Sequence, residues 1–243
     1  MINADSFKPN INGLTEFRIK QILRYVIYCY LQIRKDVKTY DYSKKGRVSK
    51  EDFLKNGLVN DYLQKNHNKE YFKQHISDNP SVEITFHPEE TMAYIGASTN
   101  ERSTDKIDIA IWENILQHIW SGETDNEIKF AIECKRIEKP SDSNKYVSDI
   151  NNFCTRNYIY TRLPFEGQIA FIENSKINHI NLSTKINEDL EGHQTIVTNS
   201  LLNQIMLSDT FKGTYLSKHQ RITTDGFSIY HLLLDYSDIV VKS

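Results

Sequence analysis

The sequence contains only three cysteines, Cys29, Cys134 and Cys154, and they are far apart. It has no Cys-x-x-Cys pair, and its eight histidines show no metal-ligand spacing, so we expect no structural zinc site. A sparse, odd set of cysteines is typical of reduced thiols and predicts a cytoplasmic protein. Cys134 lies on the inward face of an expected strand, so we interpret it as a small buried hydrophobe rather than a nucleophile.

Long hydrophobic runs are also absent. The most apolar helical stretch, residues 22–33, is interrupted by Arg24 and is too short to span a bilayer. The first five residues show no basic-then-apolar signal sequence, so we expect no membrane partner. The net charge of −2 argues against a protein that coats nucleic acid indiscriminately, although a local basic groove remains compatible with it.

What is present is enough apolar surface for a folded core. Hydrophobic residues make up 39% of the 243 positions and charged residues 26%, and no internal repeat or low-complexity segment occurs. This length suits one large domain or two small ones. We expect a single domain over residues 1–243, with a helical N-terminal part at 12–77, a core at 81–174, and C-terminal helices and a hairpin at 175–243.

Hydrophobic periodicity predicts the order of the elements. The first expected helix is capped by Asn12 or Thr15 and ends near Lys35, and the second is capped by Ser49 and covers residues 50–63. Further helices are expected at residues 69–76, 143–156, 183–190 and 195–206. The expected strands cover residues 81–86, 105–112, 128–136, 167–172, 215–221 and 227–236. His87-Pro88 is expected to end the first strand, residues 89–104 to form a loop, and residues 223–226 to form a hairpin turn. This order predicts an α/β fold, with a mixed sheet flanked by helices.

The strongest local pattern runs from Asp105 to Arg136. Two apolar strands with alternating charges enclose a polar interval, and if they pair, Asp108, Glu133 and Lys135 converge on one side. Two adjacent carboxylates repel each other unless a cation lies there, and Mg²⁺ often takes one or two carboxylates with waters and a phosphate. A neighbouring lysine could position a metal-bound water or stabilise charge on a phosphate. The pattern favours metal-assisted phosphodiester hydrolysis, and the solvent-facing side of an ordinary hairpin is the alternative.

The segments Ile107-Asp108-Ile109 and Ile132-Glu133-Cys134-Lys135 carry a resemblance. An aspartate followed by Glu-x-Lys on a hydrophobic strand, with a helix directly after it, resembles the PD-(D/E)xK superfamily of restriction-endonuclease-like nucleases. The proline that names the motif is absent, and Lys106-Ile107 stands there instead. Residues 146–174 further resemble the helix and following strand of small nuclease-like proteins of bacterial defence loci.

The resemblance implies a restriction-endonuclease-like fold and an Mg-dependent (or Mn-dependent) endonuclease that hydrolyses phosphodiester bonds, of DNA in preference to RNA, in anti-phage defence or restriction. Asp108 and Glu133 would hold the metal with the backbone carbonyl of Cys134, and Lys135 would orient or help deprotonate the attacking water. A homodimer and protein partners of a defence system are also implied. One alternative is a catalytically inactive subunit of this fold that binds nucleic acid or partner proteins in a defence complex, and another is an α/β protein with no nucleic-acid role.

Further candidates follow from the same resemblance. In that superfamily a helix before the core strands often adds an acidic residue to the metal site, and Glu16 is the first candidate, with Glu51 and Asp61 as alternatives. A glutamate in a first helical turn is also favourable to the helix dipole, which by itself explains Glu16. Gln168, on the strand after the motif helix, would support the metal ligands or position the water.

Residues 34–50 form the basic stretch of the chain, with seven basic residues against two acidic ones, a net charge of +5. Tyr40 and Tyr42 are interleaved with the charges, which suits a phosphate backbone and stacking on bases, while a solvated linker remains open as the alternative. The candidate nucleic-acid contacts are Lys44, Lys45, Arg47, Arg102, Lys106 and Arg156. Ser217, His219 and Arg221 share a strand face and could touch a phosphate, but we prefer His219 and His231 as structural partners.

Overall fold

The computed structural model describes residues 10–77, 79–96, 99–125, 127–158, 163–222 and 226–242. Its helices are α1 (Ile11–Lys35), α2 (Lys50–Leu58), α3 (Asn66–Tyr71), α4 (Asn114–Trp120), α5 (Ser143–Thr155) and α6 (His179–Glu191). Short 3-10 or π segments are η2 (Tyr42–Lys44), η3 (Val59–Leu63), η4 (Phe72–Ile76) and η5 (Pro140–Asp142). The strands are β1 (Tyr40–Asp41), β2 (Ile84–Gly96), β3 (Arg102–Glu113), β4 (Phe130–Ile137), β5 (Arg156–Tyr158), β6 (Phe165–Ile172), β7 (Val197–Gln204), β8 (Thr214–Gln220), β9 (Gly226–Asp235) and β10 (Val240–Val241).

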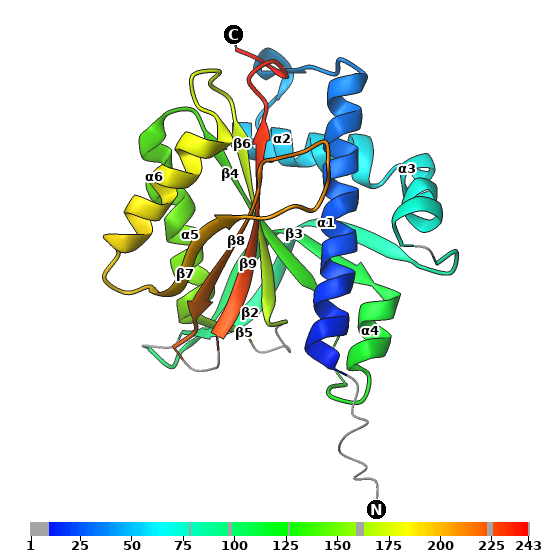
Figure 1. Ribbon diagram of the computed structural model, residues 1–243, viewed down its shortest axis with the longest axis vertical. Helices are drawn as coiled ribbons and strands as arrows, with labels where there is room; N and C mark the ends of the chain where they lie inside the picture. Colours follow the sequence, from blue (N-terminus) through cyan, green and yellow to red (C-terminus); the bar gives the residue numbers. More distant parts are fainter. Residues whose placement is uncertain are drawn as a thin grey trace, which may run out of the picture.

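A mixed sheet forms the centre of the described chain, and its eight strands run in the order β5-β2-β3-β4-β6-β9-β8-β7. The β2–β3 and β3–β4 pairs are antiparallel, β4, β6 and β9 are parallel, and β8 and β7 are antiparallel again. Helices α5 and α6 pack together on one side of the sheet, and α1 lies on the other (Figure 1). The expected α/β class, the helical N-terminal part and the C-terminal β8–β9 hairpin are therefore confirmed.

Alternation along each strand sorts the side chains between the two layers. Ile132 and Cys134 of β4 pack in the larger core with α1, whereas Ile137 packs in the core beneath α5 and α6. Parallel pairing sets Glu133 beside Gln168, and Gln168 beside His231, so these three polar residues share the α5 side of the sheet. The three cysteines are all buried, and the burial of Cys134 on the inward face of β4 confirms the expectation for that residue.

Helix α1 begins before both of the caps that we predicted, because its N-cap lies two residues before Asn12 and five before Thr15. Asn10 is the N-cap, and its Oδ1 accepts a hydrogen bond from the Gly13 N–H at 2.9 Å. Thr15 is instead fully buried, and its hydroxyl accepts a hydrogen bond from the Trp120 indole at 2.9 Å. The threonine therefore ties α1 to α4 rather than starting the helix.

The prediction that His87-Pro88 ends a strand and that residues 89–104 form a loop is wrong. Strand β2 passes through Pro88 to Gly96, and β3 begins at Arg102, so most of the supposed loop is a long hairpin. Proline is tolerated at this point because, among the described residues, β2 pairs there with β3 alone; its second neighbour, β5, pairs with it at residues 94–96. Glu89 interrupts the ladder with a φ of +58°.

The predicted helix at 195–206 is also wrong, because residues 197–204 form the edge strand β7. Its ladder with β8 shifts register twice, between Thr198 and Ser200 and between Ser200 and Asn203. These irregularities break the period-two alternation that marks a strand in a sequence. The predicted hairpin turn at 223–226 falls mostly on residues that lie outside the described ranges.

A buried chain of hydrogen bonds fixes α5 to the sheet. The Tyr146 hydroxyl lies 2.9 Å from His231 Nδ1, and Ser217 Oγ lies 2.8 Å from His231 Nε2 and 2.7 Å from His219 Nε2. His219 Nδ1 in turn lies 3.2 Å from Thr198 Oγ1. Because Ser217 has one proton, it donates to one ring and accepts from the other, and the chain is satisfied with both histidines neutral. This arrangement supports our structural interpretation of His219 and His231.

We predict that acid destabilises the fold through these two histidines. Burial lowers the pKa of His219 to about 4, and burial together with His219 lowers the pKa of His231 well below its ordinary value. As the pH falls through about 6.5, the unfolded chain takes up protons that the folded chain refuses, so the free energy of unfolding decreases down to about pH 4. His219 alone contributes up to about 3 kcal/mol to this decrease.

Urea unfolding of the wild type and His219→Gln at pH 7 and pH 4.5 measures this effect. The variant should lose less stability between the two pH values than the wild type, while His67→Gln, which removes an exposed histidine, should lose as much as the wild type. Equal losses in all three proteins would contradict the prediction.

Candidate active site

A cavity of about 230 Å³ opens between the β3–β4 pair, α5 and the start of α2. Its lining residues are Glu51, Asp105, Lys106, Asp108, Glu133, Lys135, Asp149, Asn152, Phe153 and Arg156. Five carboxyl groups therefore face three cationic side chains in a small volume. The cavity brings together Asp108, Glu133 and Lys135, together with two of the predicted phosphate contacts, Lys106 and Arg156.

Asp108 and Glu133 form a close carboxyl pair across two strands. The pairing of Ile109 with Ile132 sets them on the same face, and Asp108 Oδ2 accepts a hydrogen bond from the Cys134 N–H at 2.8 Å. Burial, reinforced by the charge of Asp108 and a hydrogen bond to it, raises the pKa of Glu133 well above its ordinary value. Without a cation, the pair therefore relieves its repulsion by keeping a proton on Glu133.

This pair fits the resemblance-implied Mg²⁺ or Mn²⁺ by the chemistry of its oxygen donors. A divalent cation would replace the shared proton, and Mg²⁺ needs only one or two carboxylates because waters complete its shell. Within the described ranges, no group of three or more His, Cys, Asp and Glu side chains is arranged to hold a metal ion. The Cys134 thiol is buried in the opposite layer, so only the backbone of Cys134 faces the pair.

Lys135 is held as a cation between two further carboxylates. Its Nζ lies 3.2 Å from Asp149 Oδ2 and 3.4 Å from Glu51 Oε1. Burial alone would lower the pKa of Lys135, but Asp149 and Glu51 outweigh it and the pKa lies above its ordinary value. A lysine that keeps its proton can orient a water or stabilise phosphate charge, but it is a poor base. Burial also raises the pKa of Asp149 to about 6, despite the opposing effect of Lys135.

Of the three acidic candidates from the N-terminal helices, the structure brings Glu51 to the cavity. Ser49 caps α2 as predicted, and Glu51, in the first turn, accepts the Arg136 N–H at 2.9 Å. Asp61 lies instead with Lys38, at 3.2 Å. Glu16 does not line the cavity, because its carboxylate pairs with Lys20 and accepts the Tyr230 hydroxyl, both at 2.8 Å.

Lys55 contacts Asp108 of the carboxyl pair and was not predicted from the sequence. Its side chain is 1% exposed, and its Nζ lies 3.0 Å from Asp108 Oδ1, 2.8 Å from Asp52 Oδ1 and 3.5 Å from Glu89 Oε1. Burial would lower its pKa, but Asp108 and Asp52 raise it above the ordinary value, so Lys55 stays charged. The sequence does give one indication that Lys55 is buried: it lies beside Leu54 on the apolar stripe of α2, where a surface lysine would not lie.

Asp149 was likewise missed as a site residue, and α5 carries it. Tyr146, one turn earlier, holds α5 to the sheet through His231. Gln168 donates to the Tyr146 carbonyl at 2.8 Å, so this predicted site residue supports α5 rather than lining the cavity. No periodic pattern distinguishes Asp149 from a surface residue of α5, because its position depends on how the helix is docked.

The predicted nucleic-acid contacts divide into two groups. Lys106 lies 3.8 Å from Glu89 at the cavity mouth, and Arg156 pairs with Asp105 and stacks over the Tyr94 ring at 5.1 Å. The others lie away from the cavity: Arg102 is exposed at the start of β3, and Lys44, Lys45 and Arg47 lie in the segment before α2. Lys45 folds back onto its own loop, where it donates to the Val48 carbonyl at 2.8 Å.

Comparison with known proteins adds no assignment: no protein-family model, curated protein or solved structure matches the chain. Among the described residues, no helix combines the length and the apolar character needed to cross a bilayer.

We predict that Lys55→Met lowers the free energy of unfolding by about 1.5–3 kcal/mol at pH 7, since it leaves the partly exposed carboxylates of Asp52, Glu89 and Asp108 without their counter-charge. Urea unfolding in the presence of EDTA measures the loss. Added Mn²⁺ should restore part of it, because a divalent cation would neutralise the same carboxylates. Lys65→Met, which removes an exposed lysine, is the matched control and should change stability by less than about 0.5 kcal/mol. A loss below about 1 kcal/mol for Lys55→Met would show that Lys55 is not their main counter-charge.

Proposed function

We propose that this chain is a divalent-metal-dependent endonuclease of the PD-(D/E)xK kind, with a restriction-endonuclease-like fold, that hydrolyses DNA. The observation that carries the proposal is the meeting of Asp108, Glu133 and Lys135 in one cavity. Glu51 supports it further, because it reaches the same cavity from a helix that precedes the core strands. Cytoplasmic action in anti-phage defence or restriction, with a second copy or other protein partners, belongs to the same proposal through the resemblance.

Each residue of the cavity has a role in this proposal. Asp108 and Glu133 would hold Mg²⁺ or Mn²⁺ with the Cys134 carbonyl, and the bound ion would supply Lewis acidity and a more acidic water. Lys135, charged and fixed by Glu51 and Asp149, orients the attacking water and stabilises the charge that builds on the phosphate.

The remaining groups would serve proton transfer and substrate binding. Asp149, with its pKa near 6, is the cavity group best suited to take up a proton near neutral pH, at Oδ2 beside Lys135. Lys106 and Arg156 at the mouth would contact backbone phosphates on either side of the cleaved bond.

A second candidate function is a nuclease-fold subunit that binds nucleic acid or partner proteins without hydrolysis. One observation favours it: Lys55 already occupies a position next to Asp108 and balances the charge that a metal ion would balance. The two functions differ in whether Asp108 and Glu133 bind a divalent cation.

Cleavage assays test the proposed function. We expect the wild type with Mg²⁺ or Mn²⁺ to cut at least one substrate in a panel of duplex, single-stranded and branched DNA and RNA. Glu133→Ala and Lys135→Ala should each reduce the rate by at least about a hundredfold, because each removes a group that acts on the transition state. Glu191→Ala and Lys145→Ala, which remove exposed charges of the same sign outside the cavity, should leave the rate unchanged.

Three outcomes separate the possibilities. Loss in both cavity variants with intact controls supports the assignment and identifies the substrate class. Equal cleavage by all five proteins would point to a contaminant and overturn it. Binding of nucleic acid without any cleavage would favour the inactive subunit.

Divalent-cation binding gives an independent prediction. Mn²⁺ at a hundred times its Kd should stabilise the wild type by about 2.7 kcal/mol, and removal by EDTA should reverse the effect. The double variant Asp108→Asn/Glu133→Gln should show no stabilisation. Because Glu133 must release its proton to bind the ion, the apparent affinity should fall as the pH is lowered. Stabilisation of the double variant equal to the wild type would place the ion elsewhere.

A further inference from the structure

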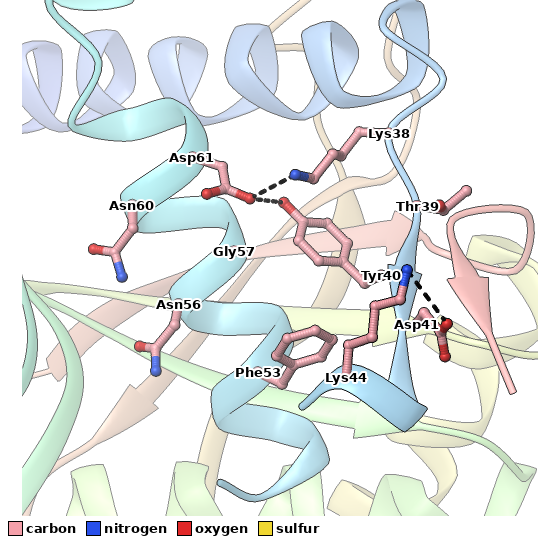
Figure 2. Close-up of a pocket in the computed structure, with 10 residues that line it drawn as sticks. All are labelled: Lys38, Thr39, Tyr40, Asp41, Lys44, Phe53, Asn56, Gly57, Asn60 and Asp61. Carbon is pink, nitrogen blue, oxygen red and sulfur yellow. Dashed lines mark hydrogen bonds and ion pairs between the residues drawn. The ribbon is translucent and has the colours of Figure 1, made fainter. Parts of the chain in front are cut away.

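A second cavity, of about 440 Å³, lies on the other side of α2 from the candidate active site. Figure 2 shows its two walls, one from the segment around β1 and one from α2 and η3. The helical spacing explains the separation: Glu51 and Lys55 share one side of α2, whereas Phe53 and Gly57 lie on roughly the opposite side. Nothing in the proposed hydrolysis uses this second cavity.

The cavity has a rigid aromatic wall that depends on a glycine. A Cβ at position 57 would overlap the Tyr40 ring, so the ring can rest against the helix only because this residue is Gly57. Glycine inside a helix costs about 1 kcal/mol relative to alanine, and here the close approach of Tyr40 gives it a packing reason. Tyr40 donates to Asp61 at 3.4 Å and meets the Phe53 ring edge to face, with centroids 5.8 Å apart. Phe53 is half-buried and thus leaves part of its ring accessible.

Two side-chain amides on the helix wall have hydrogen-bonding groups available for a ligand. Asn56 and Asn60 are four residues apart, so they lie one turn from each other on the same side of the helix (Figure 2). Neither side chain hydrogen-bonds to another residue in the described part of the chain. Each amide offers both a donor and an acceptor, which matches the mixed donor and acceptor edge of a nucleobase.

Two lysines on the facing wall add positive charge. Lys44 is 80% exposed and only loosely paired with Asp41, at 3.9 Å, and Lys38 lies 3.2 Å from Asp61 (Figure 2). An ammonium group has three N–H donors, so each lysine keeps donors for a further acceptor. Both belong to the stretch at 34–50 that carries a net charge of +5, and within the cavity they offset the charges of Asp41 and Asp61, so the spare N–H donors of the lysines are what would hold a phosphate.

We propose that this cavity binds a nucleotide unit. The base lies against Phe53 with its polar edge on Asn56 and Asn60, and the phosphate lies on Lys38 and Lys44. The volume is within the range of small-molecule sites. The same chemistry has two sources, a free nucleoside monophosphate or one unpaired nucleotide of a single strand. The inference does not require hydrolysis at the other side of α2 and therefore stands apart from the proposed function.

Binding in EDTA tests the proposal without cleavage. The four ribonucleoside monophosphates, inorganic phosphate and a fluorescein-labelled single-stranded 8-mer are titrated into the full chain, by calorimetry and by anisotropy. We expect at least one nucleotide or the 8-mer to bind more tightly than phosphate. Asn56→Ala/Asn60→Ala and Lys44→Glu should each weaken that binding by at least about tenfold. Asn144→Ala and Lys145→Glu, exposed positions of α5, are the controls and should bind as the wild type does.

Comparison of the titrated ligands then shows whether the cavity binds a free nucleotide or a nucleotide within a strand. Tight binding of a monophosphate indicates a free nucleotide, and binding of the 8-mer alone indicates a nucleotide within a strand, provided that the cavity variants weaken it. Binding no better than that of inorganic phosphate, or binding that the cavity variants leave unchanged, would overturn the proposal. All of the substituted side chains are at least partly exposed, so the variants should keep the wild-type unfolding midpoint, which checks that they are folded.

Discussion

The structure depends on one constraint: two carboxyl groups, Asp108 and Glu133, are placed side by side by the pairing of β3 with β4. Their mutual repulsion must be relieved, and the fold relieves it in three ways. The Cys134 N–H donates to Asp108, Lys55 provides a buried positive charge, and the raised pKa of Glu133 favours its protonated form. In the proposed hydrolysis, a divalent cation with its waters would take over this role from the Glu133 proton and from Lys55.

Two helices position the remaining groups around that pair. Helix α2 brings Glu51 and Lys55 to one side of it, and α5 brings Asp149 to the other. The buried chain from Tyr146 to His219 holds α5 in place, so the two neutral histidines act on the cavity only through the helix. Helix α2 also carries the wall of the second cavity, so the two cavities share a structural element without sharing a side chain.

The sequence predicts those features that arise from local alternation. Asp108, Glu133 and Lys135 alternate with buried isoleucines on two adjacent strands, so strand pairing alone brings them together. Features that depend on docking could not be predicted: Asp149 looks like any polar residue of an amphipathic helix. The sequence indicates a site role for Lys55 only weakly, because a Glu51–Lys55 spacing of i,i+4 also occurs on ordinary exposed helices.

Two errors in the predicted elements have physical causes of the same kind. We predicted that Pro88 ends a strand, but β2 has no second neighbour there among the described residues, and an edge position accommodates the missing N–H. Residues 195–206 were predicted as a helix because bulges erase the alternation of β7. In both cases, whether the segment forms a strand depends on its neighbours in the sheet. These neighbours are distant in the sequence, so a short window of residues does not reveal them.

The central claim is that Asp108 and Glu133 together bind a divalent cation. Diffraction from crystals soaked in MnCl₂, collected at the manganese edge, locates the ion directly. We expect one anomalous peak at about 2.0–2.3 Å from a carboxyl oxygen of each residue, with the Lys55 ammonium displaced from Asp108. No peak there at saturating Mn²⁺, with Lys55 still paired to Asp108, would contradict the claim and leave an α/β protein that does not use a metal at this site.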